Sequence, residues 1–210
     1  MTDLLPLFLN LSGRTVVLVG GGRVAAAKLR QLLAADASVR VVAPIVADDI
    51  ADALGPNVTI IRRGFAASDL DEAWLAVAAA TPDVNRAVAD AAHERRLFVN
   101  AVDDPANATA FLSGVVRRSG VTIAISTSGD APALTSLLRD ALDAVLPGDL
   151  ARWMQTARSE RAVWRRDGVP MTERKPQLLR ALNALYAAAD GSGAAEAGVP
   201  WLQPPEDSWL

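Results

Sequence analysis

The sequence predicts an α/β protein with a parallel sheet covered by helices on both faces. Two observations lead to this prediction. Short apolar runs alternate with helical segments through the first half of the chain, and the runs are apolar at nearly every position, as strands buried on both faces are. A glycine cluster, Gly20-Gly21-Gly22, directly follows the first apolar run, where a strand-to-helix turn is expected.

The first half contains five predicted strands and three predicted helices. The strands are expected at 15–19, 39–43, 58–62, 74–79 and 97–100. The first helix carries Ala25, Leu29, Leu32 and Leu33 on one face, and two more are expected near 47–54 and at 83–95. Because ligands of such sheets bind beyond the carboxyl ends of the strands, the functional segments should be 20–24, 43–45, 79–81 and 100–103.

After Asp103 the pattern changes to a hairpin and a series of helices. Phe111–Val116 and Val121–Thr127 are predicted to pair, with the turn at 117–120. Asp130 is the expected N-cap of a leucine-rich helix at 134–146 that has Pro132 in its first turn. Further helices are predicted at 150–164 and 176–189.

Composition limits the classes of function. The 210 residues are 51% hydrophobic and 21% charged, with net charge −3 and no apolar run near the length of a membrane span. We therefore expect neither nucleic acid nor membrane as a partner, no signal peptide, and a cytoplasmic location. The absence of cysteine and the single histidine, His93, argue against a permanent metal site.

The glycine cluster predicts a dinucleotide site. Gly20 would allow the tight turn, Gly22 would let backbone N–H groups reach a pyrophosphate, and Ala25 stands where a third glycine often occurs. An ordinary solvent-exposed turn is the alternative. The residues expected to bind the cofactor are Gly20, Gly22, Arg23, Val24, Ala43, Pro44, Ile45 and Thr81.

Positive charge gathers in the second half of the chain. Eight cations lie between Arg152 and Arg180, against three acidic residues. This cluster is either a surface for a polyanionic ligand or a solvated helix face.

Four motifs in the same order carry a family resemblance. They are Leu5-Pro6-Leu7-Phe8 with Leu11-Ser12-Gly13-Arg14, the run Val19–Lys28, Asn100-Ala101-Val102-Asp103, and Ile125–Leu134. Over about residues 1–180 the chain resembles the precorrin-2 dehydrogenase/sirohydrochlorin ferrochelatase family, the N-terminal module of siroheme synthase. The resemblance implies NAD-dependent oxidation of precorrin-2 to sirohydrochlorin, with Fe²⁺ insertion in bifunctional members. It also implies a homodimer whose second unit exchanges secondary structure between subunits.

Domain boundaries follow from the motifs and the composition. We expect a Rossmann-like NAD-binding domain at 1–110, a dimerisation unit at 111–147, a helical C-terminal domain at 148–190 and a flexible tail at 191–210. The dimerisation unit consists of two apolar strands and a leucine-rich helix. It is too small to cover its own apolar surface, which favours a homodimer.

Asp103 is the predicted catalytic residue. It follows a predicted strand end, where a carboxylate could take a proton while a nicotinamide takes a hydride, and the resemblance implies the same role as general base. An ordinary Asx-turn is the alternative, and this is the role expected of its neighbour Asp104. Because precorrin-2 carries several carboxylates, the predicted substrate-binding residues include arginines. They are Asn100, Arg117, Arg118, Ser126, Thr127, Ser128 and Arg139.

Two features leave details of the chemistry open. The second strand ends in Ala43-Pro44 and not in the acid that usually binds a ribose 2′-OH, so NAD as the cofactor is implied only by the resemblance. Arg62 and Arg63 follow the third strand and are expected to be solvated and not an NADP site. Iron could be held only transiently by oxygen ligands and the macrocycle nitrogens. The rival functions are a non-catalytic NAD-binding regulatory module and a dehydrogenase acting on another polycarboxylate.

Overall fold

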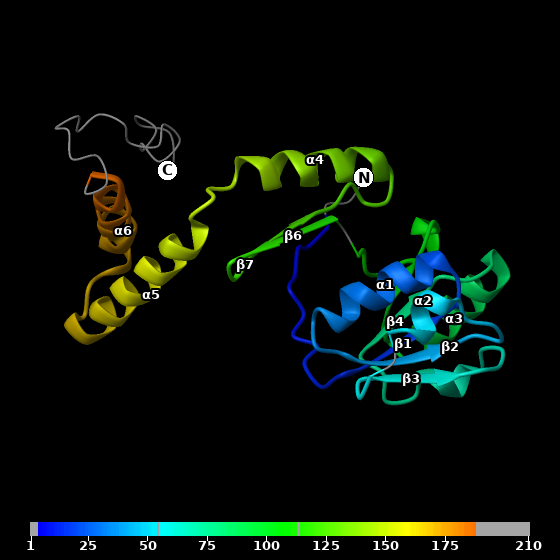
Figure 1. Cartoon of the computed structure of the whole chain (residues 1–210). Helices are drawn as coiled ribbons and strands as arrows, with labels where there is room; N and C mark the ends of the chain where they lie inside the picture. Colours follow the sequence, from blue (N-terminus) through cyan, green and yellow to red (C-terminus); the bar gives the residue numbers. More distant parts are fainter. Residues whose placement is uncertain (1–3, 54, 113, 188–210) are drawn as a thin grey trace. The chain divides into compact units, whose positions relative to one another are not determined.

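The computed structural model describes residues 4–53, 55–112 and 114–187, and the predicted tail at 191–210 lies outside these ranges. The chain divides into two compact units (Figure 1). Unit 1 comprises Met1–Gly114 and Ile125–Leu138, and unit 2 comprises Val115–Ala124 and Arg139–Leu210. The predicted dimerisation unit, 111–147, contributes residues to both, and the predicted domain boundaries remain a prediction.

Unit 1 contains the predicted parallel sheet, with strand order β3-β2-β1-β4-β5. The strands are β1 (Thr15–Val19), β2 (Ser38–Val42), β3 (Val58–Ile61), β4 (Leu75–Ala78) and β5 (Phe98–Ala101). The helices are α1 (Arg23–Leu33), α2 (Asp48–Ala51) and α3 (Pro82–Glu94), with short 3₁₀ turns η1 (Ala67–Leu70) and η2 (Pro105–Asn107). Each strand lies within about one residue of its predicted place, so the predicted Rossmann-like sheet is confirmed.

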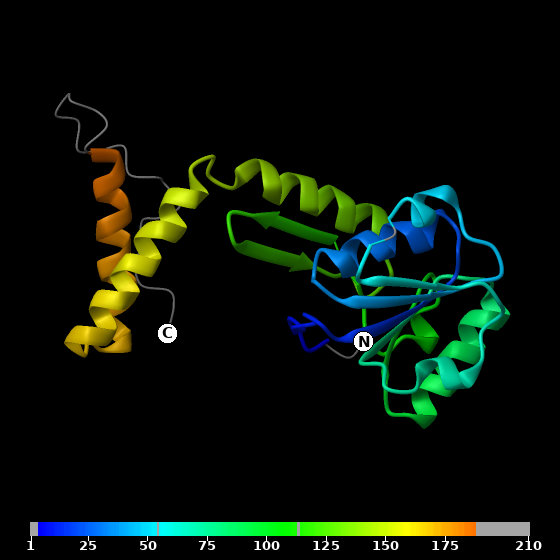
Figure 2. The same ribbon diagram turned by 60° about the horizontal axis from the view of Figure 1, so that its bottom comes forward.

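Both faces of the sheet are buried, which explains why the strands are mostly apolar. From β1, Val16 and Leu18 pack in the core that includes Leu29 of α1, while Val17 and Val19 pack in the core that includes Val88 of α3. Figure 2 shows the sheet between these helices. Alternating side chains of one strand therefore fill two separate cores.

The hairpin is shorter than predicted. It consists of β6 (Gly114–Arg118) and β7 (Val121–Ile125), which form a two-stranded sheet. Ser119 and Gly120 alone make the turn, with φ of 51° and 84°. Two successive positive φ angles match the right-handed twist of a tight hairpin, so both arginines before the turn belong to the strand and not to the turn.

Three helices follow the hairpin: α4 (Pro132–Val145), α5 (Leu150–Asp167) and α6 (Met171–Ala187). The predicted start of the last helix was wrong, because Pro176 lies inside α6 and not at its beginning. Helix α4 begins at Pro132, so Ala131, and not the predicted cap Asp130, directly precedes it, and the Oγ1 atom of Thr127 accepts the Ala131 N–H at 3.2 Å. Within the described ranges, no helix combines the length and the apolarity needed to span a membrane.

A buried carboxylate fastens the η1 turn to the sheet. Arg63 donates to both carboxylate oxygens of Asp69, at 2.8 and 2.5 Å, and the Ala66 N–H donates to one of them at 2.9 Å. Arg40 on β2 donates to the backbone carbonyl of Asp69 at 3.0 Å. The Arg63 hydrogen bonds hold the pKa of Asp69 below its ordinary value, although burial acts in the opposite direction. The ionised form of Asp69 is therefore the one that the fold stabilises.

Replacing Asp69 with Asn should lower the stability in a pH-dependent way. Because the folded-state pKa of Asp69 is depressed, its contribution is fully present above the unfolded value of about 4 and is lost as the pH falls through the folded pKa. Chemical unfolding should give a free energy of unfolding that is much lower for Asp69→Asn than for the native chain at pH 7, and this difference should become smaller below pH 4. A difference in unfolding free energy that does not change with pH would contradict the ion pair as its source.

Candidate functional site

The glycine turn after β1 packs closely between two other loops of unit 1. Gly20 has φ of 127°, and a Cβ there would overlap the carbonyl oxygen of Ala79, directly after β4. A Cβ at Gly21 would overlap the carbonyl oxygen of Ile45, after β2. Gly20 thus has the predicted role in the turn. The steric need for glycine at position 21 was missed, because it arises from a loop distant in the sequence.

The N-terminus of α1 is open for an anion. Gly22 is its N-cap, no described side chain caps it, and no acidic residue lies in the first turn. A Cβ at Gly22 would meet nothing within 4 Å, so the space there is not filled by described protein atoms. Unsatisfied N–H groups and the positive end of the helix dipole bind phosphate. These features fit the pyrophosphate of a dinucleotide, whose nicotinamide would supply the hydride acceptor.

The segment after β2 borders the glycine turn, as predicted. Ala43 is buried against the turn, and the Ala47 N–H donates to the carbonyl of Gly21 at 2.7 Å. Ile45 is 82% exposed and Val24, in the first turn of α1, is 48% exposed. Two apolar side chains are therefore open to solvent beside the glycine turn, where an adenosine would find apolar contacts.

A buried asparagine that was not predicted connects the segments after β4 and β5. Asn85 of α3 accepts the Ala80 N–H at 2.9 Å through Oδ1, and its Nδ2 donates to the Val102 carbonyl at 3.4 Å. Thr81, a predicted cofactor residue, is the exposed N-cap of the same helix. Asn85 shares the helix face of Val88 and Ala92, and a polar residue in that apolar stripe was the signal that could have identified it.

The two adjacent aspartates differ in their environments. Asp103 has φ of 57° and an exposed side chain, and it makes no hydrogen bond or ion pair with the described residues. Asp104 accepts a 2.7 Å hydrogen bond from Nδ2 of Asn107 and closes the η2 turn. A non-glycine residue in the left-handed region is uncommon, and such residues concentrate at functional sites. The carboxylate free to accept a proton is that of Asp103.

Part of the predicted substrate-binding set lies beside this aspartate pair. The chain bends at Gly129, where a Cβ would lie 3.4 Å from the side chain of Pro105, so the loop after β7 contacts the η2 turn. Ser126, Thr127 and Ser128 precede that contact, and the Oγ of Ser126 accepts the Ser128 N–H at 3.1 Å. The loop thus places hydroxyl groups near the Asp103 segment within unit 1.

Asn100 lies on β5 and is mostly buried. Its Nδ2 donates to the Ala110 carbonyl at 3.0 Å, while its Oδ1 is buried with no partner among the described residues. A buried amide oxygen without a donor is costly, which suits a group that gains a partner from a ligand or a water molecule.

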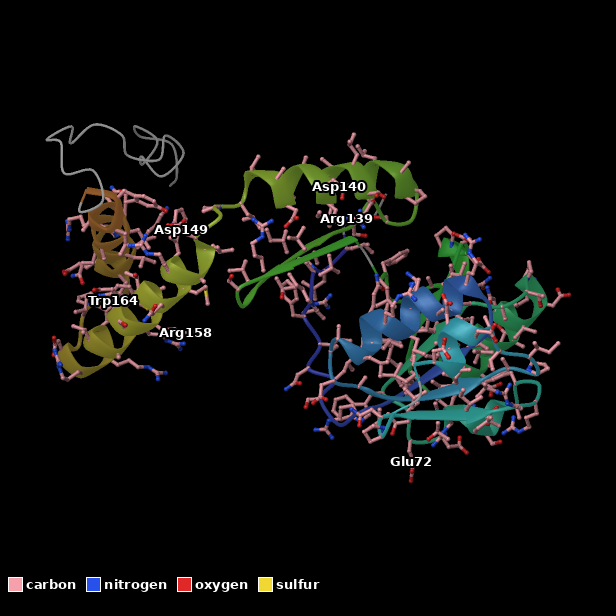
Figure 3. The ribbon with its side chains drawn as sticks, viewed as in Figure 1. Glu72, Arg139, Asp140, Asp149, Arg158 and Trp164 are labelled. Atoms are coloured by element: carbon pink, nitrogen blue, oxygen red, sulfur yellow. The ribbon has the colours of Figure 1, made fainter. Side chains whose placement is uncertain are left out.

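The predicted arginines lie on unit 2, and two of them have protein partners. Arg118 donates to the carbonyls of Asp143 and Leu146 at the end of α4, and to the Asp143 carboxylate at 2.7 Å. Arg139 pairs with Asp140 at 2.7 Å, and Figure 3 labels both on α4. Arg117 is exposed. The Arg118 guanidinium therefore stabilises the end of a helix, a role that the sequence did not suggest.

Among the other cations, too, some have protein partners and some are exposed. Arg166 pairs with Asp167 at 2.7 Å, and Arg174 donates to the Val169 carbonyl, whereas Arg158, Arg161 and Arg165 of α5 are exposed. Arg63 is exposed, as predicted for a solvated strand end, but its guanidinium also pairs with Asp69, which the prediction did not include.

His93 is exposed and lies in the last turn of α3. It lines a hollow of about 430 Å³ with Phe98 and Thr109, at the amino end of β5, and Asp103 follows the other end of that strand. Within the described part of the chain, no three His, Asp or Glu side chains gather as metal ligands would.

Replacing Gly22 with Asp should weaken dinucleotide binding without unfolding the protein. The added side chain has room in the protein, but its charge would stand where the pyrophosphate must lie. We expect the dissociation constants of NAD⁺ and NADP⁺, measured by calorimetry, to rise more than tenfold, about 1.4 kcal/mol. Gly64→Asp, another exposed glycine with open space, is the matched control and should bind normally. Equal affinities in the two variants would place the site elsewhere.

Comparison with known proteins agrees with this geometry. A family model described as NAD(P)-binding matches residues 7–114, just over half of the chain, and a model of the central part of sirohaem biosynthesis proteins matches residues 118–144. Siroheme synthase 3 of Aeromonas hydrophila is 41% identical over 150 residues, which are 70% of this chain and 32% of that protein. Siroheme synthase of Azotobacter vinelandii is 41% identical over 162 residues, 76% of this chain and 35% of that protein.

The chain thus spans about a third of the length of these relatives. Among solved structures, a chain named SirC, precorrin-2 dehydrogenase, has a similar fold, with a TM-score of 0.68 and 23% identity over 88% of this chain and 92% of that one. The resemblance seen in the motifs is confirmed, as is a nicotinamide dinucleotide as the class of cofactor. The chain belongs to the NAD(P)-binding family of siroheme-biosynthesis proteins.

Proposed function

We propose that the protein oxidises precorrin-2 to sirohydrochlorin with NAD⁺. The observation that carries this proposal is the exposed Asp103 carboxylate, held in a left-handed backbone conformation beyond β5, on the sheet whose glycine turn fits a pyrophosphate. The names of the relatives and of the structural neighbour, siroheme synthase and precorrin-2 dehydrogenase, supply the substrate.

The oxidation removes two electrons and two protons from the substrate, as one hydride and one proton. The nicotinamide of a dinucleotide held at the glycine turn would accept the hydride. The Asp103 carboxylate takes the proton from the adjoining atom and becomes a neutral carboxylic acid, which then releases the proton to solvent through its exposed face. Asp104 keeps its carboxylate in the η2 turn and stays outside the reaction.

NAD⁺ is proposed over NADP⁺ because the cofactor segment after β2 offers no cation for a 2′-phosphate. Residues 43–47 are uncharged, and the Arg63 guanidinium is committed to Asp69. Apolar Ile45 and Val24 would instead contact the adenosine.

Exposed cations able to bind carboxylates are present in unit 2, at Arg117 and at Arg158, Arg161 and Arg165 of α5. In unit 1, Ser126, Thr127 and Ser128 carry hydroxyl groups that could donate to a carboxylate. Arg118 and Arg139 have protein partners and are weaker candidates.

A homodimer is the second part of the proposal. Helix α4 buries none of its residues in the described structure, although it is strongly amphipathic. Its leucines Leu134, Leu137 and Leu138 are 46%, 65% and 39% exposed, and Val145 is 67% exposed. A contiguous apolar helix face of this kind marks an interaction surface, and a second copy of the same chain would cover it by symmetry.

Replacing Asp103 with Ala should remove the oxidation and leave cofactor binding intact. The protein is incubated anaerobically with precorrin-2 and either NAD⁺ or NADP⁺ while the absorbance is measured. We expect the absorbance of sirohydrochlorin to appear with NAD⁺. A positioned base contributes about 10²–10⁴-fold, so Asp103→Ala should be slower by that factor. Asp104→Ala, changed at the neighbouring carboxylate, is the matched control and should lose far less.

The outcomes separate the rival functions. A native chain that binds NAD⁺ but oxidises nothing would be a regulatory NAD-binding module, and equal losses in the two variants would remove Asp103 as the base. Adding Fe²⁺ to the product then tests whether the same chain also forms siroheme.

Replacing Leu137 with Glu should break the dimer. The side chain is exposed in the single chain, so the fold should survive, while a charge in an apolar interface has no partner there. Light scattering should give about twice 22.0 kDa for the native protein and about 22.0 kDa for Leu137→Glu. Met171→Glu, an exposed apolar residue on α6, is the control and should leave the mass unchanged. A native monomer at micromolar concentration would refute the proposed assembly.

A further inference from the structure

The hollow of about 430 Å³ at the amino end of β5 lies within unit 1 and has no part in the proposed oxidation. Its walls come from the last turns of α3, the start of β5 and the η2 turn. The volume falls within the range of about 300–1,000 Å³ that is typical of small-molecule sites. Asp103 follows the opposite end of β5, so a molecule bound in the hollow would leave the reacting groups accessible.

Opposite charges line the hollow without neutralising one another. Asp90 and His93 lie three residues apart on one face of α3, and Arg96 follows the end of this helix. All three are exposed, and their side chains make no hydrogen bond or ion pair with the described residues. The neighbouring Arg95, by contrast, pairs with Asp71 at 3.0 Å. A carboxylate and N–H donors without partners in one hollow are complementary to a small molecule that carries both an anionic and an ammonium group.

The backbone fixes Arg96 at the rim of the hollow. Its φ is 54°, and two backbone hydrogen bonds of 3.0 and 2.9 Å close the end of α3 around it. Helix α1 ends in the same way at Asp36, with φ of 57°, but there the side chain accepts a 2.6 Å hydrogen bond from the Ser12 hydroxyl. Glycine is the usual residue at this left-handed position. An arginine there costs backbone strain, and no described residue bonds to its guanidinium to offset that cost.

An exposed aromatic ring supplies the apolar part of the hollow. Phe98, the first residue of β5, is 52% exposed, although Val99 after it is buried. Ala89, Leu97 and Ala106 are further apolar residues in the walls. An aromatic or aliphatic group of a ligand would pack against the Phe98 ring and remove it from water.

We propose that this hollow binds a free α-amino acid with an apolar side chain. The carboxylate of the amino acid accepts hydrogen bonds from Arg96 and His93, and its ammonium donates to Asp90. Its side chain packs on Phe98. The charges on the two sides of the ligand match those of the hollow, and its apolar part covers the exposed ring.

The η2 turn connects the hollow to the Asp103 segment. Asn107 lines the hollow, and its Nδ2 donates to the carboxylate of Asp104, next to Asp103, at 2.7 Å. An Asn107 amide that turns toward the ligand gives up this bond, so an occupied hollow loosens the η2 turn and slows the oxidation. This effect rests on the proposed function, whereas the binding itself does not.

Binding is tested by calorimetry with L-phenylalanine and L-leucine, in the absence of cofactor and substrate. Both should bind at one site per chain. Two analogues of L-phenylalanine separate the charges: 3-phenylpropionate lacks the ammonium, and phenethylamine lacks the carboxylate. Each analogue should bind about tenfold more weakly or worse. Binding of either analogue as tight as that of L-phenylalanine would overturn the proposed ligand class, and no binding of either amino acid would overturn the site.

Arg96→Gly locates the site without risk to the fold. Glycine suits the left-handed backbone, so the melting temperature should be native or higher, while the dissociation constant of L-phenylalanine should rise about tenfold or more. Asp36→Gly makes the same backbone change at the end of α1 and is the matched control, with native binding expected. Equal affinities of the native chain and Arg96→Gly would overturn the proposal.

The link to the reaction is tested by kinetics with precorrin-2 and NAD⁺. Saturating L-phenylalanine should lower kcat of the native chain by about fivefold or more and leave that of Arg96→Gly unchanged. In Asn107→Ala the bond to Asp104 is already absent, so the amino acid should have little effect on kcat. A native kcat that does not respond to L-phenylalanine would overturn the link, as would inhibition that persists in Asn107→Ala. A native chain that binds L-phenylalanine through Arg96 but does not oxidise precorrin-2 would contradict the proposed function alone and support the binding site.

Discussion

The parallel pairing of β1 with β2 on one side and β4 on the other fixes the geometry of the site. Val19, the last residue of β1, is level with Val42 and with Ala78, so these three strands end together. The hydrogen-bonded ladder continues past the strands: Gly20 N donates to the Val42 carbonyl, Ala79 N to that of Val19, and Val102 N to that of Ala78, at 2.8–3.0 Å. The loops after β1, β4 and β5 are therefore extensions of the sheet.

This anchoring allows backbone conformations that an isolated loop would not keep. Gly20 and Asp103 both have positive φ; Gly20 itself donates a ladder hydrogen bond, and Asp103 directly follows Val102, which donates another. Asn85 adds side-chain bonds to Ala80 and Val102 from the helix beneath. The backbone before Asp103 is thus held by strand β4 and by Asn85, and the Asp103 carboxylate makes no hydrogen bond of its own to the described residues.

Unit 2 is stabilised differently. Its helices α5 and α6 bury few side chains, chiefly Leu150, Trp164 and Leu182, and a chain of polar bonds connects them. The Trp153 indole donates to the Tyr186 hydroxyl at 2.5 Å, and that hydroxyl donates to Asp149 at 3.0 Å. Figure 3 shows Asp149 and Trp164 along α5. A unit with so small a core leaves cations and apolar side chains exposed, which suits a surface for ligands and subunits.

The sequence by itself determined the sheet, the glycine turn and the different environments of Asp103 and Asp104, because these depend on apolar periodicity and on residues adjacent in the chain. Only the tertiary structure decided the need for glycine at position 21, the bridge made by Asn85 and the Arg63–Asp69 pair. Each of these depends on loops or side chains that meet only after the strands align. A periodic pattern in the sequence does not reveal these contacts, because they form between residues that are distant along the chain.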